Sequence, residues 1–273
     1  MYKEFYGLKE NPFKLSPDLR YFFLSPRIKK VMDQLFYGLD QNMGFMLITG
    51  EVGVGKTSML RFFISHLDDS VERAYLFNPT LASAEELLSF LIMDLKIAEG
   101  GPPSTSNKIH LLSQIHQYLL DRYAEGKKVL FIIDDAQAMP DFLLEELRLL
   151  SNFETDQDKL FQIILVGQRE LGERLRGNNL RQLNQRIPIK TALFPLTSEE
   201  TGAYINYRLM VAGSNGIVFK PKAIDLIHRA SKGLPRLINL IAERTLVAGY
   251  VRGAKELGKK EVRMALKDLE VVR

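Results

Sequence analysis

The sequence of 273 residues contains no cysteine. This absence excludes disulfide bonds, cysteine-ligated zinc and thiol nucleophiles, and it agrees with a reducing compartment. Histidine is also scarce. Its four occurrences, His66, His110, His116 and His228, show no metal-ligand spacing, so we expect surface or core roles for them.

Long hydrophobic runs are missing as well. No apolar stretch approaches the roughly 18 residues that a membrane-spanning helix needs, so we expect no transmembrane segment. Near the N-terminus, Lys3 and Glu4 occur without an apolar signal core, which favours a cytoplasmic location over export. The excess of 37 basic over 33 acidic residues is small. It permits contact with nucleic acid or an anionic membrane surface and implies neither.

A glycine-rich stretch is the most informative feature that is present. Gly50-Glu-Val-Gly-Val-Gly-Lys-Thr57 matches the phosphate-binding pattern G-x-x-x-x-G-K-[ST], known as Walker A. Its glycines let the backbone curl so that successive N–H groups point at one anion. Lys56 can reach the β- and γ-phosphates of ATP, and the Thr57 hydroxyl can ligate Mg²⁺. The predicted nucleotide-binding residues are Gly50, Glu51, Val52, Gly53, Val54, Gly55, Lys56, Thr57 and Ser58.

The flanking sequence supports this interpretation of the loop. Residues 45–49 have the pattern of a buried strand and residues 58–67 that of an apolar helix, so strand, loop and helix follow in the order that the motif requires. The positive end of the helix dipole would then face the phosphates. The alternative is a glycine-rich turn that happens to end in Lys-Thr, and the context argues against it.

A second apolar run, residues 129–133, predicts a strand buried on both faces of a parallel sheet. It ends in Asp134-Asp135, the position of a Walker B motif. Asp134 could hold Mg²⁺ at the edge of the sheet, and Asp135 could orient the water that attacks the γ-phosphate. Two acids after a strand could also form a solvated turn or cap a helix. Together with the glycine-rich loop they favour nucleotide binding.

The remaining patterns predict the fold. Strands are expected at 73–77, 161–166 and 189–194, and helices at about 26–39, 83–95, 108–124 and 143–151. This alternation is typical of an α/β fold with a doubly wound parallel sheet, as in P-loop NTPases. Past Pro195, four helical patterns follow at about 198–212, 221–232, 235–251 and 259–269, and residues 99–107 have the composition of a surface loop. We therefore expect an N-terminal segment (1–44), a nucleotide-binding domain (45–195) and an all-helical lid domain (196–273).

Gln168 follows the fourth predicted strand, at the same sheet edge as Asp134. If that strand lies between the strands that carry Lys56 and Asp134, the Gln168 amide could hold the attacking water or sense the γ-phosphate. The alternative is a polar loop residue. Arg236, after Gly233-Leu-Pro, opens a helix of the second domain and could reach the γ-phosphate from a lid.

Arginines also cluster before the fifth predicted strand. Arg181 or Arg186 could project into the site of a neighbouring subunit, where a planar, permanently charged guanidinium suits a transferring phosphoryl group. The alternative is a solvated basic face that also includes Arg169, Arg174 and Arg176.

These residues resemble the AAA+ ATPase superfamily and, within it, the ATPase domain of the general secretion pathway protein A (ExeA) type. Nearly the whole chain takes part. The matching stretches include Phe5-Tyr-Gly-Leu-Lys-Glu-Asn-Pro-Phe13, Gly50-Glu-Val-Gly-Val-Gly-Lys-Thr57, Leu147-Arg-Leu-Leu-Ser-Asn152, Leu165-Val-Gly-Gln168, Leu180-Arg-Gln-Leu183 and Gly233-Leu-Pro-Arg-Leu-Ile-Asn239. The resemblance implies that Gln168 is sensor 1, Arg236 is sensor 2, and Arg186 rather than Arg181 is the arginine finger. It also implies that Pro12 and Phe13 border the adenine.

Two departures from that family affect the expectation. The family usually has Glu where this chain has Asp135, which is one methylene shorter, so we expect slow ATP turnover without a partner or oligomerisation. Family members continue into a membrane helix and a cell-wall-binding region, whereas this sequence stops at Arg273, so we expect no direct cell-wall role.

The expected function is that of an Mg²⁺-dependent ATPase, a homo-oligomeric assembly or remodelling factor for a secretion or cell-envelope system. A membrane-bound partner could tether it to the inner membrane. The alternative is a DNA-associated AAA+ regulator, because transposition helpers and replication initiators share the architecture and basic residues occur near the C-terminus. Those residues, Arg252, Lys255, Lys259, Lys260, Arg263 and Lys267, could also be a solvated helix face. A scaffold that binds nucleotide and barely hydrolyses it is a third hypothesis.

Overall fold

The computed structural model describes residues 1–16, 18–77, 79–98, 107–155, 158–214, 216 and 218–271. They form two compact units. We call residues 29–50 and 63–193 the sheet unit, and residues 1–28, 51–62 and 194–273 the helical unit. Of the expected surface loop at 99–107, all but Asn107 lies outside the described residues.

Five parallel strands form the centre of the sheet unit. They are β1 (Phe45–Gly50), β2 (Val71–Leu76), β3 (Lys128–Ile133), β4 (Gln162–Gly167) and β5 (Ile189–Leu193), in the spatial order β2-β3-β4-β1-β5. β3 is the apolar run for which burial on both faces was predicted, and the structure also buries β4 along its whole length. The parallel sheet predicted from the sequence is confirmed, as is the position of β4 between β1 and β3.

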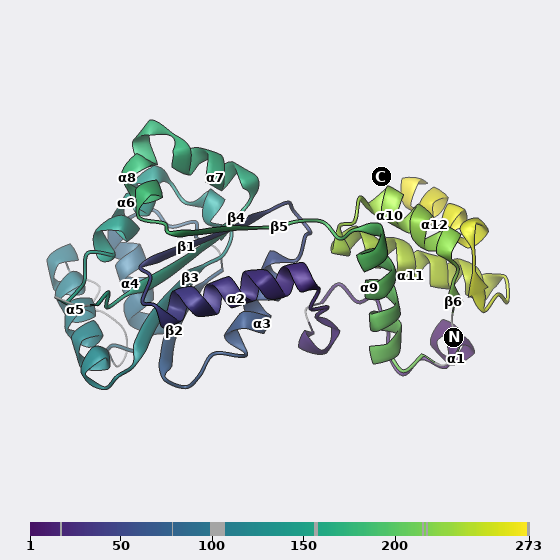
Figure 1. Ribbon diagram of the computed structural model, residues 1–273, viewed down its shortest axis with the longest axis horizontal. Helices are drawn as coiled ribbons and strands as arrows, with labels where there is room; N and C mark the ends of the chain where they lie inside the picture. The colour runs from purple at the N-terminus through teal and green to yellow at the C-terminus, as the bar shows by residue number, and fades with distance from the viewer. Residues whose placement is uncertain are drawn as a thin grey trace. The chain divides into compact units, whose positions relative to one another are not determined.

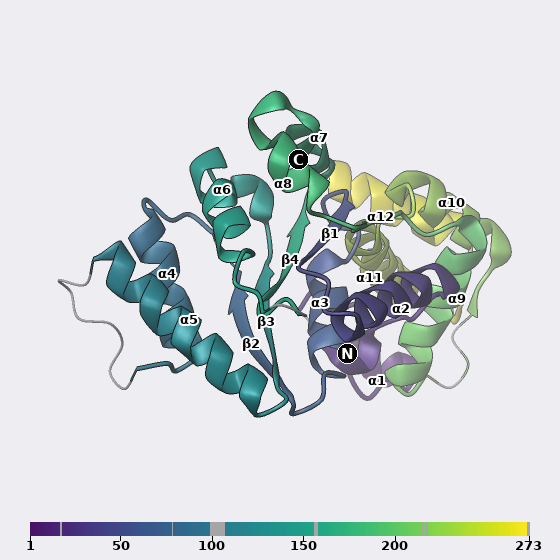
Figure 2. The same cartoon turned by 60° about the vertical axis from the view of Figure 1, so that its left-hand side comes forward.

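Because successive side chains of a strand point to opposite faces, each strand contributes to two layers. Phe45 and Leu47 belong to a core that is covered by α4 (Ala84–Asp94), α5 (Lys108–Ala124), α6 (Asp141–Leu150), α7 (Arg169–Arg176) and α8 (Arg181–Gln185). Met46 faces the other way, toward α2 (Pro26–Asp40). Gly38 of α2 lies so close that a Cβ there would be 2.6 Å from the Met46 Sδ. Figure 2 shows α4, α5 and α6 on one side of β2, β3 and β4 and α2 on the other.

The helical unit is built from α1 (Tyr2–Tyr6), the start of α3 (Lys56–Ile64), α9 (Ser198–Val211), α10 (Pro221–Ser231), α11 (Pro235–Val251) and α12 (Lys259–Val271). A short parallel pair, β6 (Val218–Phe219) and β7 (Glu256–Leu257), joins them. The four C-terminal helices confirm the predicted helical region, and they lie together in Figure 1 with α1 packed against α11. The buried guanidinium of Arg208 on α9 donates to the carbonyls of Pro12 and Lys14, so the N-terminal segment is part of this core.

Several helix starts follow local signals. Thr197 and Glu200 form a complete capping box at α9. At α4 only half of such a box is present: the Ser83 hydroxyl accepts from the Glu86 N–H, but the Glu86 carboxylate accepts from the Ala82 N–H instead of the Ser83 N–H. Two short helices, α7 and α8, were not predicted, since each offers few apolar residues within a basic stretch.

Candidate functional site

The glycine-rich loop has the backbone that the motif requires. Gly53 and Gly55 adopt φ angles of 80° and 106°, a region that side chains with a Cβ rarely enter. Lys56 begins α3 and is only 8% exposed, and its ammonium donates to the Glu51 carbonyl at 3.1 Å. A buried cation at a helix start, behind a loop with two left-handed glycines, fits a bound phosphate chain.

Arg236 lies beside this loop within the helical unit. Its backbone N–H donates to the Gly53 carbonyl at 3.3 Å, and a Cβ on Gly53 would lie 3.2 Å from the Arg236 Cβ. Pro235, at the first position of α11, has no N–H, so Arg236 supplies the first donor of the helix. The candidate sensor 2 residue is therefore joined to the candidate phosphate loop by a backbone hydrogen bond.

Asp134 and Asp135 have different environments after β3. Asp134 is 3% exposed, and its two carboxylate oxygens accept from the Tyr75 hydroxyl at 3.2 Å and the Asp135 N–H at 2.9 Å. Asp135 is exposed and has a left-handed backbone, with φ of 52° and ψ of 35°. Tyr75 was not predicted as a site residue. The sequence placed Tyr75 in an expected strand, but no local motif indicated a contact with Asp134.

The strand register brings the predicted residues of the sheet unit to one edge. Thr49 pairs with Gly167 and Ile133 with Leu165, so β1, β3 and β4 all end at the edge where Gly50, Asp134 and Gln168 are found. Gln168 is half-buried, and its backbone N–H donates to the side chain of Gln137 at 3.0 Å. Gln137 was also missed by sequence reasoning. A polar residue two positions after Asp135 was the available signal.

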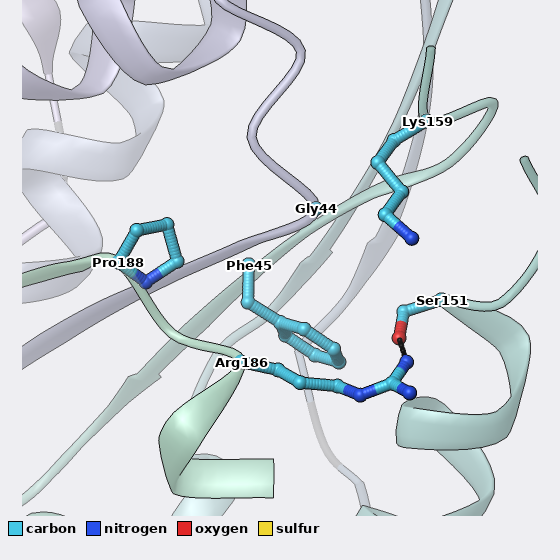
Figure 3. Close-up of a pocket in the computed structure, with 6 residues that line it drawn as sticks. All are labelled: Gly44, Phe45, Ser151, Lys159, Arg186 and Pro188. Atoms are coloured by element: carbon cyan, nitrogen blue, oxygen red, sulfur yellow. Dashed lines mark hydrogen bonds between the residues drawn. The ribbon is translucent and has the colours of Figure 1, made fainter. Parts of the chain in front are cut away.

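Arg186 lies at the opposite edge of the sheet. It precedes β5, whose Ile189 pairs with Met46 near the start of β1. Its guanidinium donates to the Ser151 hydroxyl at 3.2 Å and to the Asn152 side chain at 2.5 Å. Figure 3 shows this side chain at a cavity of about 220 Å³ that is lined by Gly44, Phe45, Ser151, Lys159, Arg186 and Pro188.

The other arginines of this stretch differ from one another. Arg181 and Arg176 are exposed, as a solvated basic face would be. Arg174 is only half-exposed and donates to the Gln137 and Met139 carbonyls, both at 2.8 Å, and to the Asp141 carboxylate. It therefore holds the turn that follows Asp135.

Pro12 and Phe13 are buried in the helical unit. The Pro12 carbonyl accepts from Arg208, and the Phe13 ring packs edge-on against Phe219 with centroids 6.2 Å apart. Their predicted contact with adenine stays a prediction.

No group of three or more His, Asp or Glu side chains that could hold a metal occurs in the described part of the chain. Mg²⁺ characteristically binds through one or two protein oxygens together with waters and substrate phosphates. The Asp134 carboxylate and the Thr57 hydroxyl are oxygen donors of that kind. Within the described ranges, no helix is both long enough and apolar enough to cross a membrane.

A family model described as an AAA domain matches residues 39–175. The chain therefore belongs to the AAA domain family, whose P-loop fold implies nucleotide binding. Among individual proteins, it is similar to general secretion pathway protein A of Aeromonas hydrophila, with 40% identity across 100% of the chain. The chain spans 49% of the length of that relative. Both findings confirm the resemblance predicted from the motifs.

Solved structures confirm the fold. Cdc6p from Pyrobaculum aerophilum superposes with a TM-score of 0.72 at 18% identity, covering 94% of this chain and 70% of that one. The Aeropyrum pernix ORC2 protein (ADPNP–ADP complexes) gives 0.67 at 18%, covering 95% and 71%. The Aeropyrum pernix ORC1 protein in complex with DNA gives 0.60 at 15%, covering 92% and 67%.

Proposed function

We propose that this chain binds ATP with Mg²⁺ and hydrolyses it as a subunit of an oligomer. One observation carries the proposal. The complete motif Gly50–Thr57 leaves directly from the carboxyl end of β1, and the neighbouring strands β4 and β3 end at the same sheet edge in Gln168 and Asp134-Asp135. Ligands of open α/β sheets bind outside the carboxyl ends of the strands.

The predicted site residues would have distinct tasks. The N–H groups of the loop and Lys56 would hold the phosphates, while Thr57 and Asp134 would hold the metal ion. When bound, Mg²⁺ would neutralise part of the negative charge of the phosphates. Asp135 would orient the attacking water, and Gln168 would contact that water or the γ-phosphate.

Three further roles follow from the family. Arg236 would sense the γ-phosphate, and Pro12 and Phe13 would border the adenine. Arg186 would complete the site of a neighbouring subunit. The register supports this last role. Ile189, three residues after Arg186, pairs with Met46, and the loop begins four residues further along β1 at Gly50. At roughly 3.3 Å per residue, Ile189 and the start of the loop are about 13 Å apart along the strand. Arg186 lies beyond the amino end of the sheet, so its guanidinium is poorly placed to reach the phosphate loop of the same chain.

In the cell we propose an assembly or remodelling factor for a secretion or cell-envelope system, active in the cytoplasm and brought to the inner membrane by a partner. The identity to general secretion pathway protein A supports this role. Since the chain spans about half of that relative, the partners and the remodelled substrate are part of the proposal.

A DNA-associated regulator is the second candidate. Five basic residues near the C-terminus are exposed and, within the described ranges, have no ion-pair partner, whereas Arg252 pairs with Glu261. The five are Lys255, Lys259, Lys260, Arg263 and Lys267. Such side chains could follow a phosphate backbone.

Titration of the purified protein with ATP and Mg²⁺ tests the proposed activity. We expect Lys56→Ala to bind ATP about 100-fold more weakly and to lose hydrolysis, since a hydrogen bond to a charged group contributes about 1.5–3 kcal/mol. Lys222→Ala, which removes an exposed lysine of α10, is the matched control and should behave as wild type. Unchanged ATP affinity of the Lys56→Ala protein would contradict the proposal.

Adding duplex DNA to the same assay separates the two cellular roles. A DNA regulator should bind with an affinity that falls steeply with salt, and DNA should stimulate its hydrolysis. A secretion factor should show neither effect and should instead bind membrane components of a secretion system.

A further inference from the structure

Gln137 joins two parts of the candidate hydrolytic edge through a single amide. It lies in the 3₁₀ helix η2 (Ala136–Ala138), directly after Asp135. Its Nε2 donates to the Asp135 Oδ1 at 3.1 Å, and its Oε1 accepts from the backbone N–H of Gln168 at 3.0 Å. One end of the amide therefore contacts the candidate water-orienting carboxylate, and the other contacts the end of β4.

The chemistry of the two partners determines which way the amide faces. A backbone N–H can only donate, and a carboxylate can only accept, so the oxygen must face Gln168 and the nitrogen must face Asp135. Gly167 leaves the space for this arrangement, since a Cβ there would lie 2.9 Å from the Gln137 Oε1. A larger residue at that position would displace the amide.

The backbone of Gln137 is held as well. Arg174 of α7 donates to its carbonyl at 2.8 Å and to the Met139 carbonyl at 2.8 Å. The turn after Asp135 is thus tied to the helix that follows β4, while the Gln137 side chain is tied to β4 itself. Both connections are hydrogen bonds, which depend on direction as well as on distance.

Asp135 needs such support because of its own geometry. It is exposed, its backbone is left-handed, and its side chain is short, so the hydrogen bond from Gln137 restrains where the carboxylate points. With Oδ1 bonded to Gln137, Oδ2 keeps both of its acceptor sites for a water. Displacements of about 1 Å at a reacting group can lower a rate about 100-fold.

We propose that Gln137 is a positioning residue for ATP hydrolysis, holding the Asp135 carboxylate in register with Gln168. This inference rests on the proposed ATPase function. It assigns Gln137 no contact with nucleotide. Its loss should therefore lower kcat and leave ATP affinity unchanged.

Two substitutions test the role. Gln137→Met keeps the length of the side chain and removes both hydrogen bonds. Gln137→Glu keeps an acceptor for the Gln168 N–H, but a carboxylate cannot donate to Asp135. We expect kcat to fall about 10- to 100-fold in both variants, with the Kd for ATP within about twofold of wild type. Gln182→Met, at an exposed position of α8, is the matched control and should retain wild-type kcat.

The outcomes are distinguishable. A merely structural role would lower the melting temperature of Gln137→Met and raise its Kd for ATP, and Gln137→Glu would then keep a wild-type kcat. That result, in a wild-type protein that hydrolyses ATP, overturns this inference alone. A wild-type protein that binds no ATP overturns the proposed function and this inference with it.

Discussion

At the scale of single residues, Asp135 is the position where this chain departs from the related family. Its left-handed backbone is one that Asp and Asn tolerate better than most other side chains. The related family usually has Glu there. In this chain the side chain is one methylene shorter, and the residue fits the left-handed backbone better. We infer that the protein spends long periods in an ATP-bound state before hydrolysis.

We predict that Asp135→Glu raises kcat, because the added methylene brings the carboxylate closer to the attacking water. The variant should lose about 1 kcal/mol of unfolding free energy, since Glu fits the left-handed region less well. Steady-state hydrolysis and chemical denaturation measure the two effects.

Asp135→Asn is the control, because it keeps the backbone tolerance, removes the charge and should lower hydrolysis. Equal rates for wild type and Asp135→Glu would favour the nucleotide-binding scaffold. A wild-type rate of about 10 s⁻¹ without any partner would contradict the slow turnover that we infer.

At the scale of elements, the start of α11 contacts two other segments of the helical unit. Gly233, just before the helix, has a φ of 74°, and its carbonyl accepts from the Leu196 N–H at 2.9 Å. Three residues later, Arg236 donates to Gly53. One helix end therefore contacts both the phosphate loop and the segment that follows β5.

We predict that Gly233→Ala strongly destabilises the protein. A Cβ there would lie 2.1 Å from the Leu196 carbonyl oxygen, so backbone would have to move. We expect a loss of about 3 kcal/mol or more, in the range of substitutions that strain a special backbone conformation. Chemical denaturation measures the loss.

Gly253→Ala is the matched control. Gly253 has a φ of 64°, but no atom lies within 4 Å of its would-be Cβ, so the cost should stay at about 1 kcal/mol. Equal losses in the two variants would show that the contact with Leu196 contributes nothing.

At the scale of the whole molecule, Arg186 bears on how many chains make one active site. It lies at the amino edge of the sheet, and the phosphate loop leaves from the carboxyl edge. Ser151 and Asn152, at the end of α6, hold its guanidinium near the surface. An exposed and restrained arginine of this kind is suited to the active site of a second copy of the chain.

We predict that Arg186→Ala and Lys56→Ala proteins are each inactive and recover part of the hydrolysis when mixed. In a mixed oligomer, an intact phosphate loop of one chain can meet an intact Arg186 of another. Hydrolysis assays over a range of mixing ratios measure the recovery. The control mixes the Arg181→Ala protein with the Lys56→Ala protein. Because the Arg181→Ala protein alone should be active, mixing should not increase its hydrolysis. No recovery at any ratio would indicate a self-contained site.

The sequence alone determined the phosphate loop, the strands and the long helices. The phosphate loop is a local feature, because glycine spacing and the adjoining strand and helix specify it within a few residues. The five strands and the long helices were predictable for the same reason, since each carries its own apolar period. The capping box at Thr197 and Glu200 needs only residues three apart.

Only the tertiary structure decided which distant residues meet. Gln137 reaches Gln168 because β4 lies beside β3 in the sheet, and Arg174 supports the same turn from α7. Arg208 joins the N-terminal segment to α9 although nearly two hundred residues separate Arg208 from Pro12. Such contacts depend on strand order and helix packing. No local period encodes them, since a polar side chain looks the same in the sequence whether water or a distant backbone group becomes its partner.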